Sequence, residues 1–162
     1  MVRMSKKKKD RYVVNSIYPE ALDKIKVKDI MNQRPPVIDA DVSIGEVVKH
    51  LRTQKEDYLL VVGTEKKLVG IVTESDILYA FKTPSTHKLV GASAVSEIGK
   101  KTATKAAEIM TKHPVTIFPD MDVQEALSIM IAHKFRHLPV VDQDKLVGSI
   151  AISNILDYIL KK

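Results

Sequence analysis

Apolar positions along this chain change spacing in a regular order, and that order occurs twice. A short apolar run after a proline predicts a strand, and the apolar residues at three- and four-residue spacing that follow predict a helix with one apolar face. Two apolar runs separated by a polar turn then predict a hairpin, and a last apolar segment predicts a closing helix. The elements are expected at 37–38, 44–51, 58–62, 68–72 and 75–81, and again at 115–118, 123–131, 138–141, 146–150 and from 153 to the C-terminus. The predicted order is β-α-β-β-α in each half, an α/β (α+β) fold class in which helices pack on sheets.

Both predicted first helices begin with a polar residue that is followed by a glutamate three positions later. Ser43 precedes Glu46 in the first half, and Asp122 precedes Glu125 in the second. This spacing is typical of a capping box, in which the two side chains satisfy backbone N–H groups at the start of a helix. We therefore expect both residues to cap their helices.

The two halves are copies of one sequence pattern. The copies align at an offset of 79 positions, which becomes 78 after one extra residue in the 63–67 turn of the first copy. The aligned identical pairs include Ile30 and Ile109, Met31 and Met110, Pro35 and Pro114, Ile38 and Ile117, Leu59 and Leu138, Gly70 and Gly148, and Ser75 and Ser153. Because there are only two copies and the period is too long for common solenoid repeats, the sequence predicts two similar small domains, 26–82 and 105–162, related by a pseudo-twofold axis. Residues 83–104 are expected to be a linker, with a short helix near 104–110.

Composition narrows the cellular setting. The chain has no cysteine, so disulfides and thiolate metal sites are excluded, and nothing indicates an oxidising compartment. It contains no apolar run of about 20 residues that would cross a bilayer and no secretory signal at its start, so we expect a soluble cytoplasmic protein with no membrane contact. Much of the formal charge of +6 lies in a basic tail and lead-in at 1–25. Such a tail is typical of a solubilising segment.

Three short motifs give the chain its family resemblance. They are an apolar-Met pair at 30–31 and 109–110, a Pro-Val-Val-Asp strand at 139–142, and Gly-apolar-apolar-Thr-x-x-Asp at 70–76. With these motifs each copy resembles a cystathionine-β-synthase (CBS) domain, and the pair resembles a Bateman module over about 27–160. The resemblance implies that the copies pack sheet to sheet and form two clefts, each of which can hold AMP, ADP, ATP, S-adenosylmethionine or a relative. It also implies a homodimer and regulation of an unidentified effector protein rather than catalysis, with no catalytic cofactor.

Thr73 and Asp76 are the first candidates for ligand contacts. They stand where a buried strand gives way to a helix, so the backbone N–H groups and the helix dipole favour a bound phosphate. The Thr73 hydroxyl can donate to a phosphate oxygen, and the Asp76 carboxylate can accept from both ribose hydroxyls. The structural alternative is that Thr73 is an N-cap and Asp76 a first-turn acid with no ligand.

The resemblance implies that the other copy completes this cleft. Arg136 and His137 stand just before the second hairpin, where family members place basic residues that bind phosphate, and Lys134 adds charge. Backbone groups of Val115 and Thr116 are expected to contact the adenine edge. Apolar walls are expected from Ile117, or from Ile30 and Met31.

The opposite cleft departs from the pattern. Ala151 replaces the threonine, Asn154 replaces the aspartate beside Ser153, and the positions that match Arg136 and His137 hold Asp57 and Tyr58. An acid there repels phosphate by on the order of 1 to 4 kcal/mol at about 4 Å. We expect asymmetric occupancy, with a weaker second site formed by Val37, Ile38, Tyr58, Ser153 and Asn154.

Three other functions are alternatives to ligand sensing. Nucleic-acid binding would use the basic tail and the lysine-rich linker, and would show a steep dependence on salt. A metal or catalytic site would rest on His133 and His137 alone, without a carboxylate or cysteine to complete it, so neither an enzyme nor a metal site is expected. An assembly unit that has lost its ligands is opposed by the intact Thr73 and Asp76.

Overall fold

A computed structural model describes residues 22, 24–54, 57–82 and 105–160. The basic tail and the 83–104 linker, on which the nucleic-acid alternative rests, lie outside the described residues. The first half of the described chain contains α3 (Val27–Ile30), β1 (Val37–Asp39), α4 (Ile44–Gln54), β2 (Tyr58–Val62), the 3-10 turn η2 (Thr64–Lys66), β3 (Leu68–Thr73) and α5 (Glu74–Lys82). The second half contains α7 (Ala106–Ile109), β4 (Thr111–Lys112), α8 (Val123–His133), β5 (His137–Asp142), β6 (Lys145–Ala151) and α9 (Ile152–Leu160).

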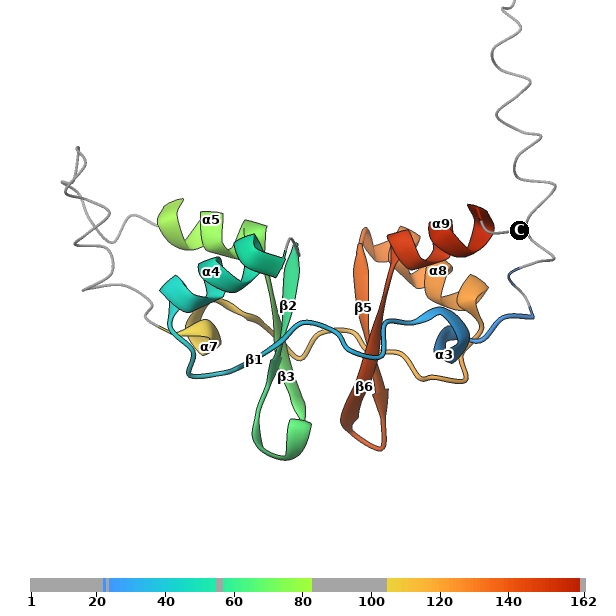
Figure 1. Cartoon of the computed structure of the whole chain (residues 1–162), viewed down its shortest axis with the longest axis horizontal. Helices are drawn as coiled ribbons and strands as arrows, with labels where there is room; N and C mark the ends of the chain where they lie inside the picture. The colour runs from blue at the N-terminus through green and yellow to red at the C-terminus, as the bar shows by residue number, and fades with distance from the viewer. Residues whose placement is uncertain (1–21, 23, 55–56, 83–104, 161–162) are drawn as a thin grey trace, which may run out of the picture.

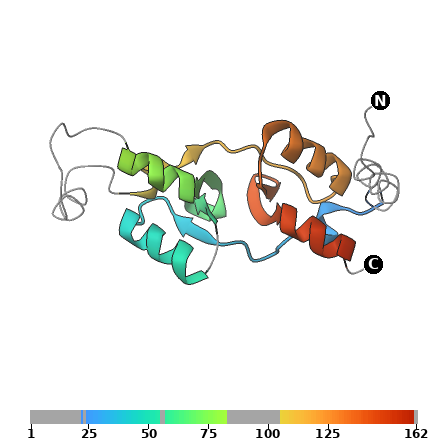
Figure 2. The same cartoon turned by 90° about the horizontal axis from the view of Figure 1, so that it is seen from above.

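The two halves lie side by side with their hairpins adjacent at the centre and their helices outside (Figure 1). The β2–β3 hairpin stands beside the β5–β6 hairpin, and an isolated bridge joins Lys67 to Lys145 across them. Viewed from above, α4 and α5 cover one hairpin and α8 and α9 cover the other in a matching arrangement (Figure 2). The predicted α+β fold of two repeats packed sheet to sheet about a pseudo-twofold axis is confirmed.

Each hairpin is extended on both sides by short flanking segments. In the first half β1 pairs in parallel with β2, and β4 pairs antiparallel with β3, which gives a sheet of order β1-β2-β3-β4. In the second half the same places are taken by single bridges, Ile117 to Val140 and Asn32 to Ser149. Pro139 explains the shorter pairing of Ile117, because proline has no N–H to donate.

The prediction of a strand over 115–118 is therefore wrong, since of these residues only Ile117 forms a bridge. In the first half the Leu60 N–H donates to the Pro36 carbonyl at 2.9 Å, and the residue that matches Leu60 is Pro139. Only the two bonds around Ile117 form, from its N–H to Pro139 at 3.0 Å and from the Val141 N–H to its carbonyl at 2.9 Å.

The lead-in helices are exchanged between the halves. Val27 of α3 is fully buried in the core of the second repeat, which also contains Ile117, Met130 and Ile150. Ala106 of α7 is fully buried in the core of the first repeat. Each repeat is therefore completed by a segment that precedes the other repeat in sequence, and the two cannot separate without exposing these side chains.

The aligned glycines allow these lead-in segments to cross the hairpins. A Cβ at Gly148 would lie 2.8 Å from the Asn32 carbonyl oxygen, and a Cβ at Gly70 would overlap the Met110 side chain. Glycine removes that Cβ and permits the close approach. The backbone of Asn32 then exchanges two hydrogen bonds with Ser149, at 2.8 and 3.0 Å.

One of the two predicted helix caps is confirmed. The Ser43 hydroxyl accepts from the Glu46 N–H at 3.2 Å, and Glu46 accepts from the Ser43 N–H at 3.3 Å, as a capping box requires. The prediction for Asp122 is wrong, because its carboxylate makes no cap and instead accepts from Lys26 Nζ at 2.8 Å. Lys26, on the exchanged lead-in segment, thus binds the Asp122 carboxylate in place of the N–H groups at the start of α8.

Candidate ligand-binding site

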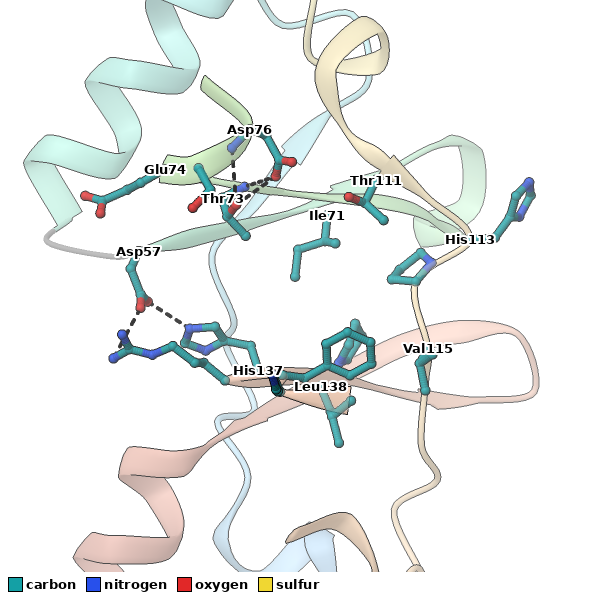
Figure 3. A pocket seen from close by; sticks show the side chains of 16 residues that line it. Asp57, Ile71, Thr73, Glu74, Asp76, Thr111, His113, Val115, His137 and Leu138 are labelled. Atoms are coloured by element: carbon teal, nitrogen blue, oxygen red, sulfur yellow. Dashed lines mark hydrogen bonds and ion pairs between the residues drawn. The ribbon is translucent and has the colours of Figure 1, made fainter. Parts of the chain in front are cut away.

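A cavity of about 490 Å³ lies between the two repeats, at the end of the hairpins where β3 passes into α5 and where β5 begins (Figure 3). It is lined by both repeats and by the segment that follows β4. The lining residues from the first repeat are Asp57, Ile71, Thr73, Glu74, Ser75 and Asp76. Those from the segment after α7 and from the second repeat are Thr111, His113, Pro114, Val115, Lys134, Phe135, Arg136, His137, Leu138 and Pro139.

Thr73 and Asp76 form the cap of α5 at the wall of this cavity. Asp76 Oδ2 accepts from the Thr73 N–H at 2.7 Å and from the Thr73 hydroxyl at 2.8 Å, and the Asp76 N–H lies 3.4 Å from Thr73 Oγ1. Thr73 and Asp76 thus bind each other as a cap of α5 without a ligand, as the structural alternative for this pair predicts. This cap does not use the whole carboxylate, because no partner of Asp76 Oδ1 is found within the described residues.

Arg136 and His137 line the cavity opposite that cap, and both contact Asp57. Asp57 Oδ1 lies 3.0 Å from His137 Nε2, and Asp57 Oδ2 lies 3.8 Å from Arg136 Nη2. The His137 contact is close but does not have the direction of an N–H···O bond, so neither ring nitrogen of His137 has a hydrogen-bond partner in the described part of the chain. The contact is an ion pair only when the imidazole is protonated.

Tyr58 lies on the pseudo-twofold axis rather than within one cleft. Its ring stacks on the ring of His137, the residue that matches it in the second repeat, with centroids 4.0 Å apart. Its hydroxyl lies 2.7 Å from the hydroxyl of Ser149, which is buried. A ring and two hydroxyls therefore bind the repeats together beside the cavity.

The segment at 114–116 offers unpaired backbone groups at the far end of the cavity. Because Pro139 cannot donate, the Val115 carbonyl lacks the bond that the matching Pro36 carbonyl accepts from Leu60. Within the described residues neither Val115 nor Thr116 makes a backbone hydrogen bond. An acceptor beside an apolar cavity wall suits the edge of a planar heterocycle with an amino group.

The other residues predicted for this site are divided between the cavity and the core. Lys134 lines the cavity from the left-handed position that ends α8, with φ of 57°. Thr116 is adjacent to the lining residue Val115 but is not itself part of the wall, and Ile117 is fully buried in the second core. Ile30 and Met31 also pack on that core and do not line this cavity.

Three ionisable lining residues were not among the residues predicted for this site. Glu74 begins α5 beside Thr73, and His113 has a left-handed backbone with φ of 49°. Asp57 was assigned to the opposite cleft because it aligns with Arg136. Its position next to the pseudo-twofold axis brings it against Arg136 itself.

The second candidate cleft has lost much of its hydrogen-bonding capacity to the chain itself. The Asn154 amide oxygen accepts from the Ala151 N–H at 2.7 Å, the same bond that Asp76 Oδ2 accepts from the Thr73 N–H in the first repeat. Ile38 is buried in the first core, whereas Val37 and Ser153 are exposed. Asn154 and Ser153 are the polar side chains that this cleft retains from its predicted set.

Neither a metal centre nor a membrane span is found in the described residues. No group of three His, Cys, Asp or Glu side chains is close enough there to hold a metal ion. His133 stacks on Phe135 with ring centroids 5.2 Å apart, instead of facing His137. None of the helices described is long and apolar enough to cross a bilayer.

Comparisons with known proteins agree with this architecture. The sequence pattern of the CBS domain matches residues 27–83 and 106–161. The uncharacterized protein MJ1426 of Methanocaldococcus jannaschii is 29% identical, over 83% of this chain and 90% of its own length. Inosine-5′-monophosphate dehydrogenase of Nitrosopumilus maritimus is 31% identical over 88% of this chain, which spans 27% of that enzyme.

Two solved structures contain adenosine compounds. Arabidopsis thaliana CBSX2 in complex with AMP matches with a TM-score of 0.70 and 26% identity, over 84% of this chain and 96% of the other. The CBS domain pair of protein MJ0100 in complex with 5′-methylthioadenosine and S-adenosyl-L-methionine matches with a TM-score of 0.68 and 27% identity, over 85% and 98%. The family model matches two segments that together cover more than half of the chain, and the chain belongs to the CBS domain family as a tandem pair.

Proposed function

We propose that this protein is a regulatory CBS pair that binds an adenosine compound in the cavity between its repeats and signals the bound state to an effector protein. The observation that carries the proposal is that one cavity is lined by Asp76 and Val115, whose Oδ1 atom and backbone carbonyl have no partner among the described residues. A carboxylate oxygen suits ribose hydroxyls, and a backbone carbonyl suits the amino group of adenine.

The remaining lining residues fit the same ligand. Ile71, Leu138 and Pro139 supply apolar walls for the base. The known ligands of the two similar structures are AMP for CBSX2, and 5′-methylthioadenosine with S-adenosyl-L-methionine for MJ0100. We infer a ligand of that class for this chain.

A regulatory rather than a catalytic role follows from the same comparison. The dehydrogenases that this chain resembles are matched over 22% to 27% of their length, whereas the uncharacterized protein MJ1426 is matched over 90% of its length. Binding without turnover is the activity we expect.

The proposal is tested by thermal unfolding against AMP, ADP, ATP, S-adenosylmethionine and 5′-methylthioadenosine. A ligand present at about 100 times its Kd adds about 2.7 kcal/mol to the free energy of unfolding. We expect at least one compound to raise the midpoint, and the rise to be lost in Asp76→Ala. Asn154→Ala, at the matching position of the second repeat, is the control and should keep the rise. No rise with any compound, or equal rises in all three proteins, would contradict the proposal.

The same proposal includes a homodimer formed through the outer helices. The matching residues Leu78 of α5 and Leu156 of α9 are 68% and 53% exposed, and Leu160 is 82% exposed. Apolar side chains gathered on two helices of one molecule suit a contact with a second copy. Sedimentation should give a dimer that Leu78→Glu converts to a monomer; a wild-type monomer at micromolar concentration would refute this part alone.

A further inference from the structure

The described residues that line the cavity carry more negative than positive charge. Asp57, Glu74 and Asp76 are acidic, whereas Lys134 and Arg136 are the basic residues apart from two histidines. With neutral imidazoles the lining has three negative and two positive charges. A phosphate group, which carries up to two negative charges, therefore has no net electrostatic advantage in this cavity.

Asp57 also lies beside the two groups that a phosphate would use. Its carboxylate oxygens lie 3.0 Å from His137 Nε2 and 3.8 Å from Arg136 Nη2. The His137 side chain is 13% exposed, so a ligand has little other access to that ring. A phosphate would have to displace the Asp57 carboxylate or lie beside it.

The positions of the labelled side chains show which end of a nucleoside would meet Asp57. In Figure 3 Asp57 and Glu74 lie at one end of the cavity, Val115 and His113 lie at the other, and Asp76 lies between them. A ligand with its base at Val115 and its ribose at Asp76 would extend its 5′ substituent toward Asp57.

We propose that Asp57 is a specificity-determining residue, which makes this cavity prefer an adenosine compound with a neutral or cationic 5′ group over a phosphorylated one. The inference rests on the proposed function and names the ligand class of the same site. A thioether or sulfonium at the 5′ position adds no negative charge beside the Asp57 carboxylate and leaves its contacts with Arg136 and His137 in place. A 5′-phosphate brings like charges together.

The test is calorimetric titration of the full chain with 5′-methylthioadenosine and with AMP. These probes share the adenosine group and differ in the charge of the 5′ substituent. The unaltered protein is expected to bind 5′-methylthioadenosine more tightly. Asp57→Asn should raise the affinity for AMP on the order of 10-fold, the effect of removing one nearby charge in a partly hydrated site, and leave that for 5′-methylthioadenosine almost unchanged.

Two further variants control for net charge and for side-chain size. Asp142→Asn changes the net charge equally at the far end of the β5–β6 hairpin, outside the cavity lining, and should leave both affinities unchanged. Asp57→Glu keeps the charge and should retain the preference for 5′-methylthioadenosine.

The possible failures are distinguishable. If the unaltered protein prefers AMP, or if Asp57→Asn binds both compounds with an unchanged ratio, the role of Asp57 is refuted while adenosine binding stands. If neither protein binds any adenosine compound, the proposed function fails and this inference fails with it. The preference of the unaltered protein decides the matter even if the Asp57→Asn variant does not fold.

Discussion

Pro139→Val is the substitution that most specifically tests how the cavity contacts a base. The proline lies in β5, where the matching Leu60 of the first repeat donates its N–H to the Pro36 carbonyl at 2.9 Å. A valine restores that donor and keeps a small apolar side chain in a strand. We expect its N–H to bond the Val115 carbonyl and to extend the pairing of the 115–117 segment.

The magnitude follows from three terms. A new backbone hydrogen bond adds about 0.5 to 1.5 kcal/mol to the free energy of unfolding. Loss of the proline restraint on the unfolded chain removes about 0.4 to 1 kcal/mol. The two nearly cancel, so the stability should stay within about 1 kcal/mol of the unaltered protein. The ligand loses its acceptor, which should weaken binding by about 0.5 to 1.5 kcal/mol, or roughly 2- to 12-fold.

Two assays together check this reasoning. Amide hydrogen exchange should show a protected N–H at position 139, and calorimetry should show the weaker affinity without a matching loss of stability. A protected amide with unchanged affinity would show that the Val115 carbonyl does not contact the ligand.

Three further predictions concern the cap, the glycines and one surface ion pair. Asp76→Ala should lower the free energy of unfolding in chemical denaturation by about 1 kcal/mol, because it removes the α5 cap. It should also abolish ligand binding. A loss of stability with full binding would show that Asp76 has only a structural role. Gly148→Ala should lower the free energy of unfolding by about 2 to 4 kcal/mol, which is more than the effect of Gly70→Ala. The Cβ at position 148 would meet a backbone carbonyl that cannot move alone, whereas the neighbour of Gly70 is a methionine side chain. Equal losses of stability in denaturant titrations would contradict this geometry. The hydrogen bond and charge of Lys28 lower the pKa of Asp120, and the same interactions raise the pKa of Lys28. The small stabilisation from this exposed pair should therefore be present at neutral pH and be lost as pH falls below about 3.8 or rises above about 10.5. A Lys28→Ala variant whose unfolding midpoint differs from that of the unaltered protein at pH 2 would argue against this.

Much of the fold could be predicted from the sequence, because burial follows the spacing of apolar residues. The strands Tyr58–Val62 and Leu68–Thr73 were predicted to within a residue or two. Runs of valine, leucine and isoleucine that flank a polar turn are compatible with few structures other than a hairpin. The sequence repeat also predicted the hairpin of β5 and β6. The exchange of the lead-in helices was not predicted, because apolar spacing shows that Val27 is buried but not which core buries it.

The site was harder to predict than the fold. Thr73 and Asp76 stand in one motif, and both line the cavity. Asp57 was placed in the other cleft, because an alignment of two repeats cannot separate the clefts for residues beside the axis that relates them. The loss of strand pairing at Val115 follows from Pro139, a residue visible in the sequence, but its effect required knowing which segment it faces.

The most direct test of the central claim is the stoichiometry of binding, measured by calorimetry with the adenosine compound that stabilises the protein most. The account predicts one molecule per chain, because Asp76 Oδ1 has no partner among the described residues, whereas the single amide oxygen of Asn154 accepts from the Ala151 N–H. Binding should be lost in Asp76→Ala and kept in Asn154→Ala. Two equivalent molecules per chain, or a binding heat that survives Asp76→Ala, would contradict the account.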